Sequence, residues 1–67
     1  MSPQLRETYV EISRMPQSPK EYAERTGMNS QTVHTRFRRL LKMGLIERWD
    51  TVYSGSRPRV VYKAKAI

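Results

Sequence analysis

Between residues 30 and 42 the chain carries a run of side chains that suit contact with a polyanion. Four cations and three hydroxyl groups lie there together with one amide and one imidazole, and no acidic residue interrupts the run. Cationic side chains bind phosphate oxygens, and the amide, imidazole and hydroxyl groups can hydrogen-bond the edges of bases. These residue types predict nucleic-acid binding, and the alternative is a basic face that is only solvated.

The distribution of charge favours binding over simple solvation. Residues 1–29 contain four basic and four acidic side chains, whereas residues 30–67 contain nine basic and two acidic ones. The whole net charge of +7 therefore lies in the second part of the chain. A basic surface that served only solubility would have no reason to be divided in this way, whereas a polyanion-binding face would.

Other kinds of chemistry have little support in the sequence. The chain has no cysteine and one histidine, so disulfides and thiolate metal sites are excluded, and no catalytic grouping or glycine-rich phosphate loop is present. We expect no enzyme activity, cofactor, metal or small-molecule substrate. No apolar run is long enough for a membrane span or a secretory signal. These observations predict a soluble, cytoplasmic protein, associated with the nucleoid if its source is bacterial or archaeal.

Capping residues and glycines divide the first two thirds of the chain into three helices. Ser2 precedes a proline and a helical apolar pattern, which predicts a first helix over residues 3–14. Residues 18–21 read Ser-Pro-Lys-Glu, a capping box, and the helix that follows ends at residues 26–27. Asn29 is a candidate cap for a third helix that runs to about Met43, with Gly44 as its terminator.

The third helix has two predicted faces. The core stripe comprises Val33, Phe37, Leu40, Leu41 and Gly44. The opposite face comprises Gln31, Thr35, Arg38, Arg39 and Lys42, with Thr32, His34 and Arg36 on the flanks. The cations and hydrogen-bonding groups of the run are therefore turned outward.

The remainder of the chain predicts a β-hairpin. Residues 45–53 and 59–64 are rich in β-branched and aromatic side chains, and residues 54–58 between them read as a turn. Pro58 must lie in this turn or at the start of the second strand, because it has no N–H to donate. Tyr9, Tyr22, Trp49 and Tyr62 are expected to pack in the core and hairpin rather than stack on bases.

Two helices joined by residues 26–29, with Ala23, Gly27 and Val33 at suitable offsets, predict a helix-turn-helix. The run from Thr32 to Arg48 resembles the recognition helix and first strand of winged-helix regulators of the multiple-antibiotic-resistance and arsenic-resistance repressor types, which often read T-V-S-x-x-L-x-x-L-x-x-x-G-L-I. The segment 56–62 is similar to their wing. The resemblance implies one α+β winged helix-turn-helix domain over residues 1–67 that binds double-stranded DNA, with Phe37 in place of the usual Leu and His34 in place of Ser.

Groove dimensions assign roles to the side chains of this domain. When a helix lies in a major groove, the side chains of its first half reach the base edges. We therefore expect base contacts from Gln31, His34, Thr35 and Arg38. The groups expected at phosphates and flanking positions are Lys20, Ser30, Thr32, Arg36, Arg39 and Lys42. Arg57 and Arg59 at the wing suit a minor groove.

The sequence therefore predicts a transcriptional regulator that binds DNA with a sequence preference. A protein-interaction module and an architectural or replication-related DNA-binding protein remain alternatives. A homodimer formed through the first helix or the second strand is also left open.

Overall fold

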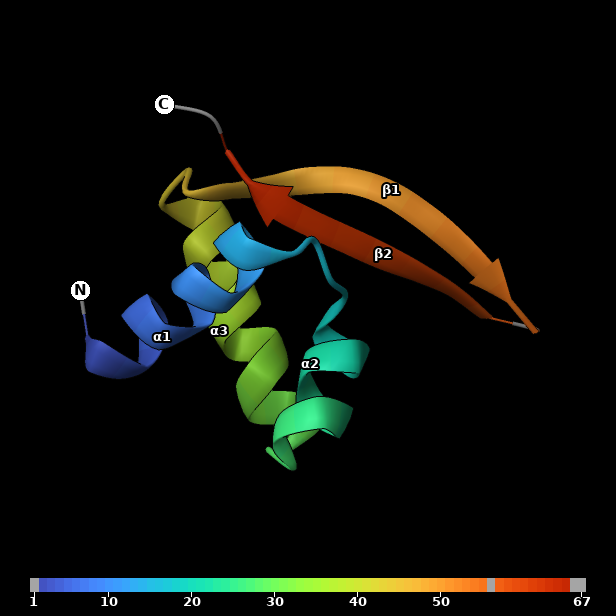
Figure 1. Ribbon diagram of the computed structural model, residues 1–67, viewed down its shortest axis with the longest axis horizontal. Coiled ribbons are helices and arrows are strands. Elements are labelled where there is room, and N and C mark those ends of the chain that lie inside the picture. Colours follow the sequence, from blue (N-terminus) through green and yellow to red (C-terminus); the bar gives the residue numbers. More distant parts are fainter. Residues whose placement is uncertain (1, 56, 66–67) are drawn as a thin grey trace.

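The computed structural model describes residues 2–55 and 57–65 and contains five elements in chain order (Figure 1). Three helices come first, α1 (Pro3–Arg14), α2 (Pro19–Thr26) and α3 (Ser30–Lys42). An antiparallel hairpin of β1 (Ile46–Ser54) and β2 (Arg57–Ala64) follows. The predicted α+β winged helix-turn-helix fold is confirmed, with the hairpin as the wing.

Side-chain caps fix where each helix begins. The Ser2 and Asn29 side chains accept hydrogen bonds from backbone N–H groups in the first turns of α1 and α3. At α2 the Ser18 hydroxyl accepts from the Glu21 N–H at 3.2 Å, and the Glu21 carboxylate accepts from the Ser18 N–H at 3.3 Å. These bonds satisfy donors that a helix leaves unpaired at its start. The three predicted helix starts are therefore confirmed.

The turn between α2 and α3 depends on a glycine. Gly27 ends α2 in the left-handed region at φ 73°, and its N–H donates to the Ala23 carbonyl at 2.9 Å. A residue with a Cβ is strained in this conformation, whereas glycine adopts it freely. The chain can therefore reverse within the few residues that separate the two helices.

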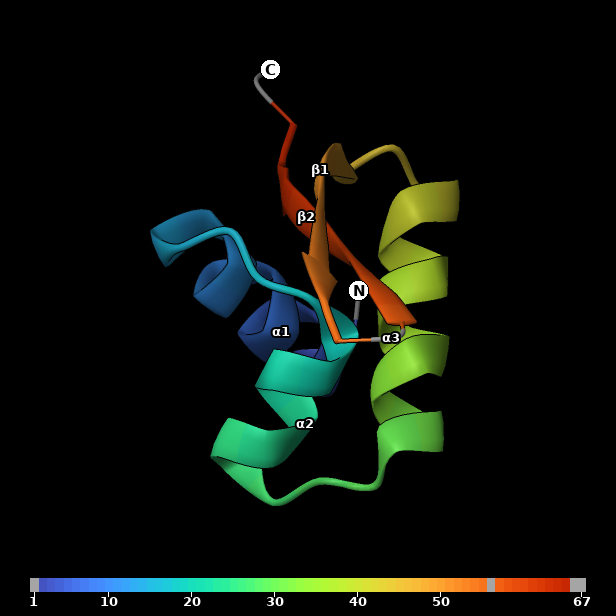
Figure 2. The same ribbon diagram turned by 90° about the vertical axis from the view of Figure 1, so that its right-hand side faces the viewer.

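One apolar core joins the three helices to the base of the hairpin. Its centre is Phe37 of α3, whose ring lies edge-on to Tyr22 of α2 and Tyr62 of β2, with centroid distances of 5.9 and 5.7 Å. Val33 and Leu40 of α3 are fully buried beside it. In the view of Figure 2, α1 lies to the left and α3 to the right, and the buried side chains of both helices meet in one core cluster. The face of α3 opposite to these buried residues is left free.

Two predictions about apolar side chains are wrong. Leu41 was expected in the core but is 36% exposed, because it is rotated by about 100° from the buried Leu40 near the end of α3. Trp49 was expected to pack in the core or hairpin but is 55% exposed. The register shifts between Arg48 and Asp50, so Trp49 is an extra residue without a partner in β2, and the normal alternation of inward and outward side chains is broken there.

The hairpin is longer than the sequence predicts. The strand ladder reaches Ser54 paired with Arg57, so the connection is shorter than the predicted turn over residues 54–58. Pro58 is the second residue of β2 and lies opposite Tyr53, which agrees with its expected place near the start of the strand. The strands therefore carry the wing farther beyond the helices than expected.

An unpredicted bridge fixes the hairpin to the helices. Gln17, in the connection between α1 and α2, exchanges two backbone hydrogen bonds with Tyr62 of β2, each 3.0 Å long. Its buried side chain donates to the carbonyls of Glu11 and Met15 at 3.0 and 3.1 Å, and its amide oxygen accepts from Arg25 at 2.8 Å. Gln17 thereby links α1, α2 and β2, and it sets the position of the wing relative to the helix-turn-helix.

Candidate nucleic-acid interface

The outward face of α3 carries the side chains predicted to face a ligand. Gln31, Thr35, Arg38 and Lys42 are all exposed, on the side opposite to the buried Val33 and its core neighbours. The Thr35 hydroxyl donates to the Gln31 carbonyl at 2.9 Å, so toward a ligand it offers lone pairs rather than its proton. This face presents an amide and two cations that can donate hydrogen bonds, and a hydroxyl that can accept one.

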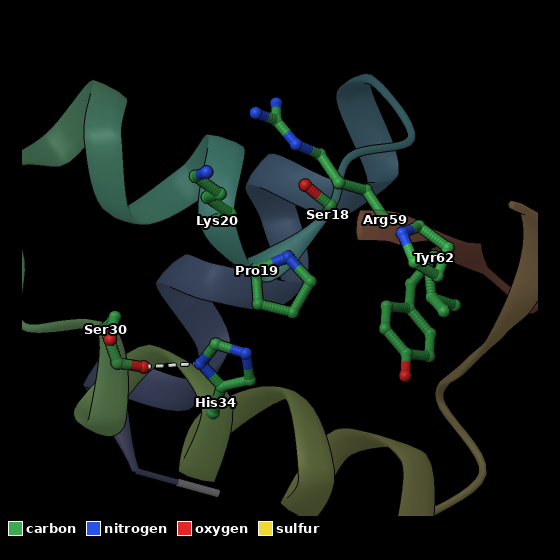
Figure 3. A pocket seen from close by; sticks show the side chains of 9 residues that line it. Ser18, Pro19, Lys20, Ser30, His34, Arg59 and Tyr62 are labelled. Atoms are coloured by element: carbon green, nitrogen blue, oxygen red, sulfur yellow. Dashed lines mark hydrogen bonds between the residues drawn. The ribbon is translucent and has the colours of Figure 1, made fainter. Parts of the chain in front are cut away.

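A groove of about 570 Å³ continues this face toward the wing (Figure 3). Its walls come from the start of α2, the first half of α3 and strand β2. Four predicted site residues meet around it, namely Lys20, Ser30, His34 and Arg59. The structure therefore joins side chains from three elements into one concave, basic surface.

The groove also contains residues that the sequence does not predict to contact a ligand. They are Ser18, Pro19, Pro58, Val60 and Tyr62. Ser18 and Pro19 adjoin Lys20 in the sequence, whereas Pro58, Val60 and Tyr62 reach the groove only through the path of the hairpin. Their apolar atoms form part of the walls between the basic groups.

His34 has a defined hydrogen bond at the edge of this groove. Its Nδ1 lies 2.7 Å from the carbonyl oxygen of Ser30, one turn earlier in α3 (Figure 3). A carbonyl oxygen only accepts, so Nδ1 must carry the hydrogen. The remaining ring nitrogen, Nε2, is the one available to a ligand.

A second group of predicted residues lies on the other flank of α3. Thr32, Arg36 and Arg39, together with Thr35, line a hollow of about 340 Å³ against the start of α1. Arg36 is half-buried there, and its guanidinium donates to the sulfur of Met28 at 3.7 Å. The structure thus separates Thr32, Arg36 and Arg39 from the groove beside the wing.

Of the two predicted wing arginines, Arg59 takes part in the groove. It is half-buried and lines the groove from β2. The side chain of Arg57, which was also predicted to contact a ligand, lies outside the described part of the structure. Only Arg59 therefore enters the geometry of the groove.

Ion pairs leave the basic residues of the interface free. Among residues 2–55 and 57–65, the ion pairs join Glu11 to Arg14 and Arg25, and Lys63 to Glu47. None of them involves a residue of α3, Lys20 or Arg59. The positive charge on this side of the molecule is therefore not neutralised by carboxylates within the described chain, and it remains available to an anionic ligand.

The described residues offer no alternative chemical centre. Within this part of the chain, no group of histidine and acidic side chains is arranged to hold a metal ion. Over the same residues, no helix has the length and apolar character of a membrane span. The basic surface is the site that the geometry singles out.

Comparison with known proteins agrees with this geometry. Residues 16–47 match the family model described as winged helix-turn-helix DNA-binding, a segment that includes α2, α3 and the turn between them. The match supports DNA binding by this chain. No match is found among curated proteins.

Proposed function

We propose that residues 1–67 act as one DNA-binding domain of a transcriptional regulator that recognises double-stranded DNA with some sequence preference. The observation that carries the proposal is the basic surface that runs from the outward face of α3 into the groove beside β2 and has no described carboxylate paired to it. The family match over α2 and α3 supports the same conclusion.

In this proposal α3 enters the major groove and the hairpin follows the backbone or an adjacent minor groove. A major groove of about 12 Å admits one helix, whose first half meets the bases. The proposed base-contacting residues are Gln31, His34, Thr35 and Arg38. The proposed backbone and flanking contacts are Lys20, Ser30, Thr32, Arg36, Arg39, Lys42, Arg57 and Arg59.

The resemblance to repressors of the multiple-antibiotic-resistance and arsenic-resistance types supports a role in transcription. A homodimer formed through α1 or β2 is the second part of the proposal. Selection of binding sites from a randomised duplex pool tests both points, since a palindromic consensus reports sequence preference and two-fold symmetry together.

A salt titration with two variants tests the assigned surface. Each phosphate contact contributes about 0.9 to the slope of log affinity against log salt concentration. Arg59→Ala is expected to lower this slope by about 0.9 and to weaken all duplexes alike, because the residue is assigned to the backbone. Arg38→Ala is expected to reduce discrimination between the selected and a scrambled duplex by about 1–3 kcal/mol.

Arg14→Ala is the matched control for this titration. Its side chain is 74% exposed on α1, and it is paired with Glu11 outside the proposed surface. It should leave both the slope and the discrimination unchanged. Affinity that does not depend on salt, or equal behaviour of all three variants, would contradict the proposal. Recovery of a protein partner without duplex binding would favour the interaction-module alternative.

A further inference from the structure

We propose that the groove between α2, α3 and β2 holds one backbone phosphodiester of the bound duplex, and that His34 takes up a proton as this phosphate enters. The inference rests on the proposed function and specifies what this part of the surface binds. It also assigns His34 to the backbone when the duplex is bound, in place of a role at a base edge.

The hydrogen bond of His34 defines what the ring can offer. Nδ1 donates to the Ser30 carbonyl, so in the neutral ring Nε2 carries only a lone pair. A phosphate oxygen is also an acceptor, and two acceptors cannot form a hydrogen bond with each other. The phosphate can therefore be bound by His34 only when Nε2 has gained a proton and the ring has become a cation.

The groups around the groove explain why the proton would arrive together with the ligand. Lys20 faces the groove from α2, Arg59 and Tyr62 face it from β2, and Arg38 lies one turn farther along α3. Among the residues that the structure describes, no carboxylate lines the groove, and the Glu21 carboxylate accepts from the Ser18 N–H. A phosphate that enters among these cations brings a negative charge next to His34, and a neighbouring negative charge favours the protonated form of an imidazole.

The composition of the walls favours a phosphate over a base. A base amine would need His34 as a neutral acceptor, and it would gain nothing from the cations of Lys20 and Arg59. Ser30 and His34 also lie on the hairpin side of α3 rather than at the centre of its outward face. An anion in the groove would instead be attracted by the basic groups that the three elements contribute, Lys20, His34 and Arg59.

Proton uptake on binding is directly measurable, because His34 is the only histidine in the chain. Titration calorimetry with a selected duplex, in buffers of different ionisation enthalpy near neutral pH, gives the number of protons taken up per bound chain. We expect up to one proton for the natural chain and a decrease in Kd of up to about tenfold per unit decrease in pH, since imidazole titrates in this range. His34→Gln should show neither effect and keep a weaker, pH-independent affinity.

Two variants separate this site from the rest of the surface. Arg39 lies on the other flank of α3. Arg39→Gln should therefore reduce the salt dependence of the affinity and leave the proton uptake unchanged. His34→Gln is expected to fold normally because the side chain is exposed, and circular dichroism checks this. The Nε2 signal of the single imidazole, observed by nitrogen-15 NMR, should change to that of a protonated ring only when duplex is added.

The possible results distinguish this inference from the proposed function. Absence of duplex binding by the natural chain contradicts the proposed function itself. Tight binding without proton uptake, or binding that weakens as the pH falls, overturns the phosphate assignment and places His34 as an acceptor from a base. The last control replaces the duplex by inorganic phosphate at the same concentration of phosphate groups. If this protonates the His34 ring to the same extent as the duplex does, the assignment to the DNA backbone is overturned.

Discussion

Replacing Gln17 by alanine tests whether its buried side chain stabilises the connection between α1 and α2 that bridges to β2. The substitution removes three hydrogen bonds, to the Glu11 and Met15 carbonyls and from Arg25, at a side chain that is 1% exposed. Each such bond contributes about 0.5–1.5 kcal/mol net, so we expect the free energy of unfolding to fall by about 2–4 kcal/mol. A domain of this size is stable by only about 3–10 kcal/mol in total.

Urea unfolding followed by circular dichroism measures this loss, and a decrease in Tm of about 10 °C or more should accompany it. Gln4→Ala is the matched control, because Gln4 is exposed in the first turn of α1, and it should change stability by no more than about 0.5 kcal/mol. The backbone bridge between Gln17 and Tyr62 can form in either variant. A loss below about 1 kcal/mol for Gln17→Ala would therefore refute the role given to its side chain.

Two further substitutions test the turn and the core. Gly27→Ala should lower the free energy of unfolding by about 1 kcal/mol in urea, because φ is 73° and the added Cβ meets no atom within 4 Å, so strain alone acts. An unchanged stability would contradict the left-handed conformation. Phe37→Ala should cost about 3–5 kcal/mol, whereas Phe37→Leu should cost less than about 1.5 kcal/mol because it keeps an apolar group between Tyr22 and Tyr62. Equal losses in thermal unfolding would show that this position is not packed as described.

The helices were predictable because their boundaries depend on short-range contacts. Ser18 and Glu21 cap α2 by bonding to each other three residues apart, and Gly27 ends the same helix through its own backbone conformation. Such signals involve residues only a few positions apart, and they act independently of the rest of the chain. The fold class followed once these helices were combined with the strand pattern of the last third.

The features that were missed depend on contacts distant in sequence or on local irregularity. Gln17 pairs with Tyr62 across 45 positions of the printed sequence, and no periodicity indicates that partner. Trp49 is displaced by a bulge, which strand alternation cannot anticipate. The same limit applies to the candidate site, since the outward face of α3 was predictable from its helical period. The meeting of Lys20, His34 and Arg59 in one groove required the path of the hairpin.

The division of charge along the chain has a physical consequence for the whole domain. In the neutral first part, Glu11 pairs with Arg14 within α1 and with Arg25 of α2, and the second pair helps connect the two helices. In the basic second part, the cations of α3 have no described carboxylate partner, so they repel one another and oppose folding. Added salt screens this repulsion and also weakens attraction to a polyanion, so it acts in opposite directions on folding and on binding. Bound DNA relieves the same repulsion by placing phosphates next to the cations rather than by screening. A ligand that binds only the folded state of a protein stabilises that folded state. The unpaired cations of α3 oppose folding of the free domain. The same cations would therefore make the DNA-bound domain more stable than the free domain.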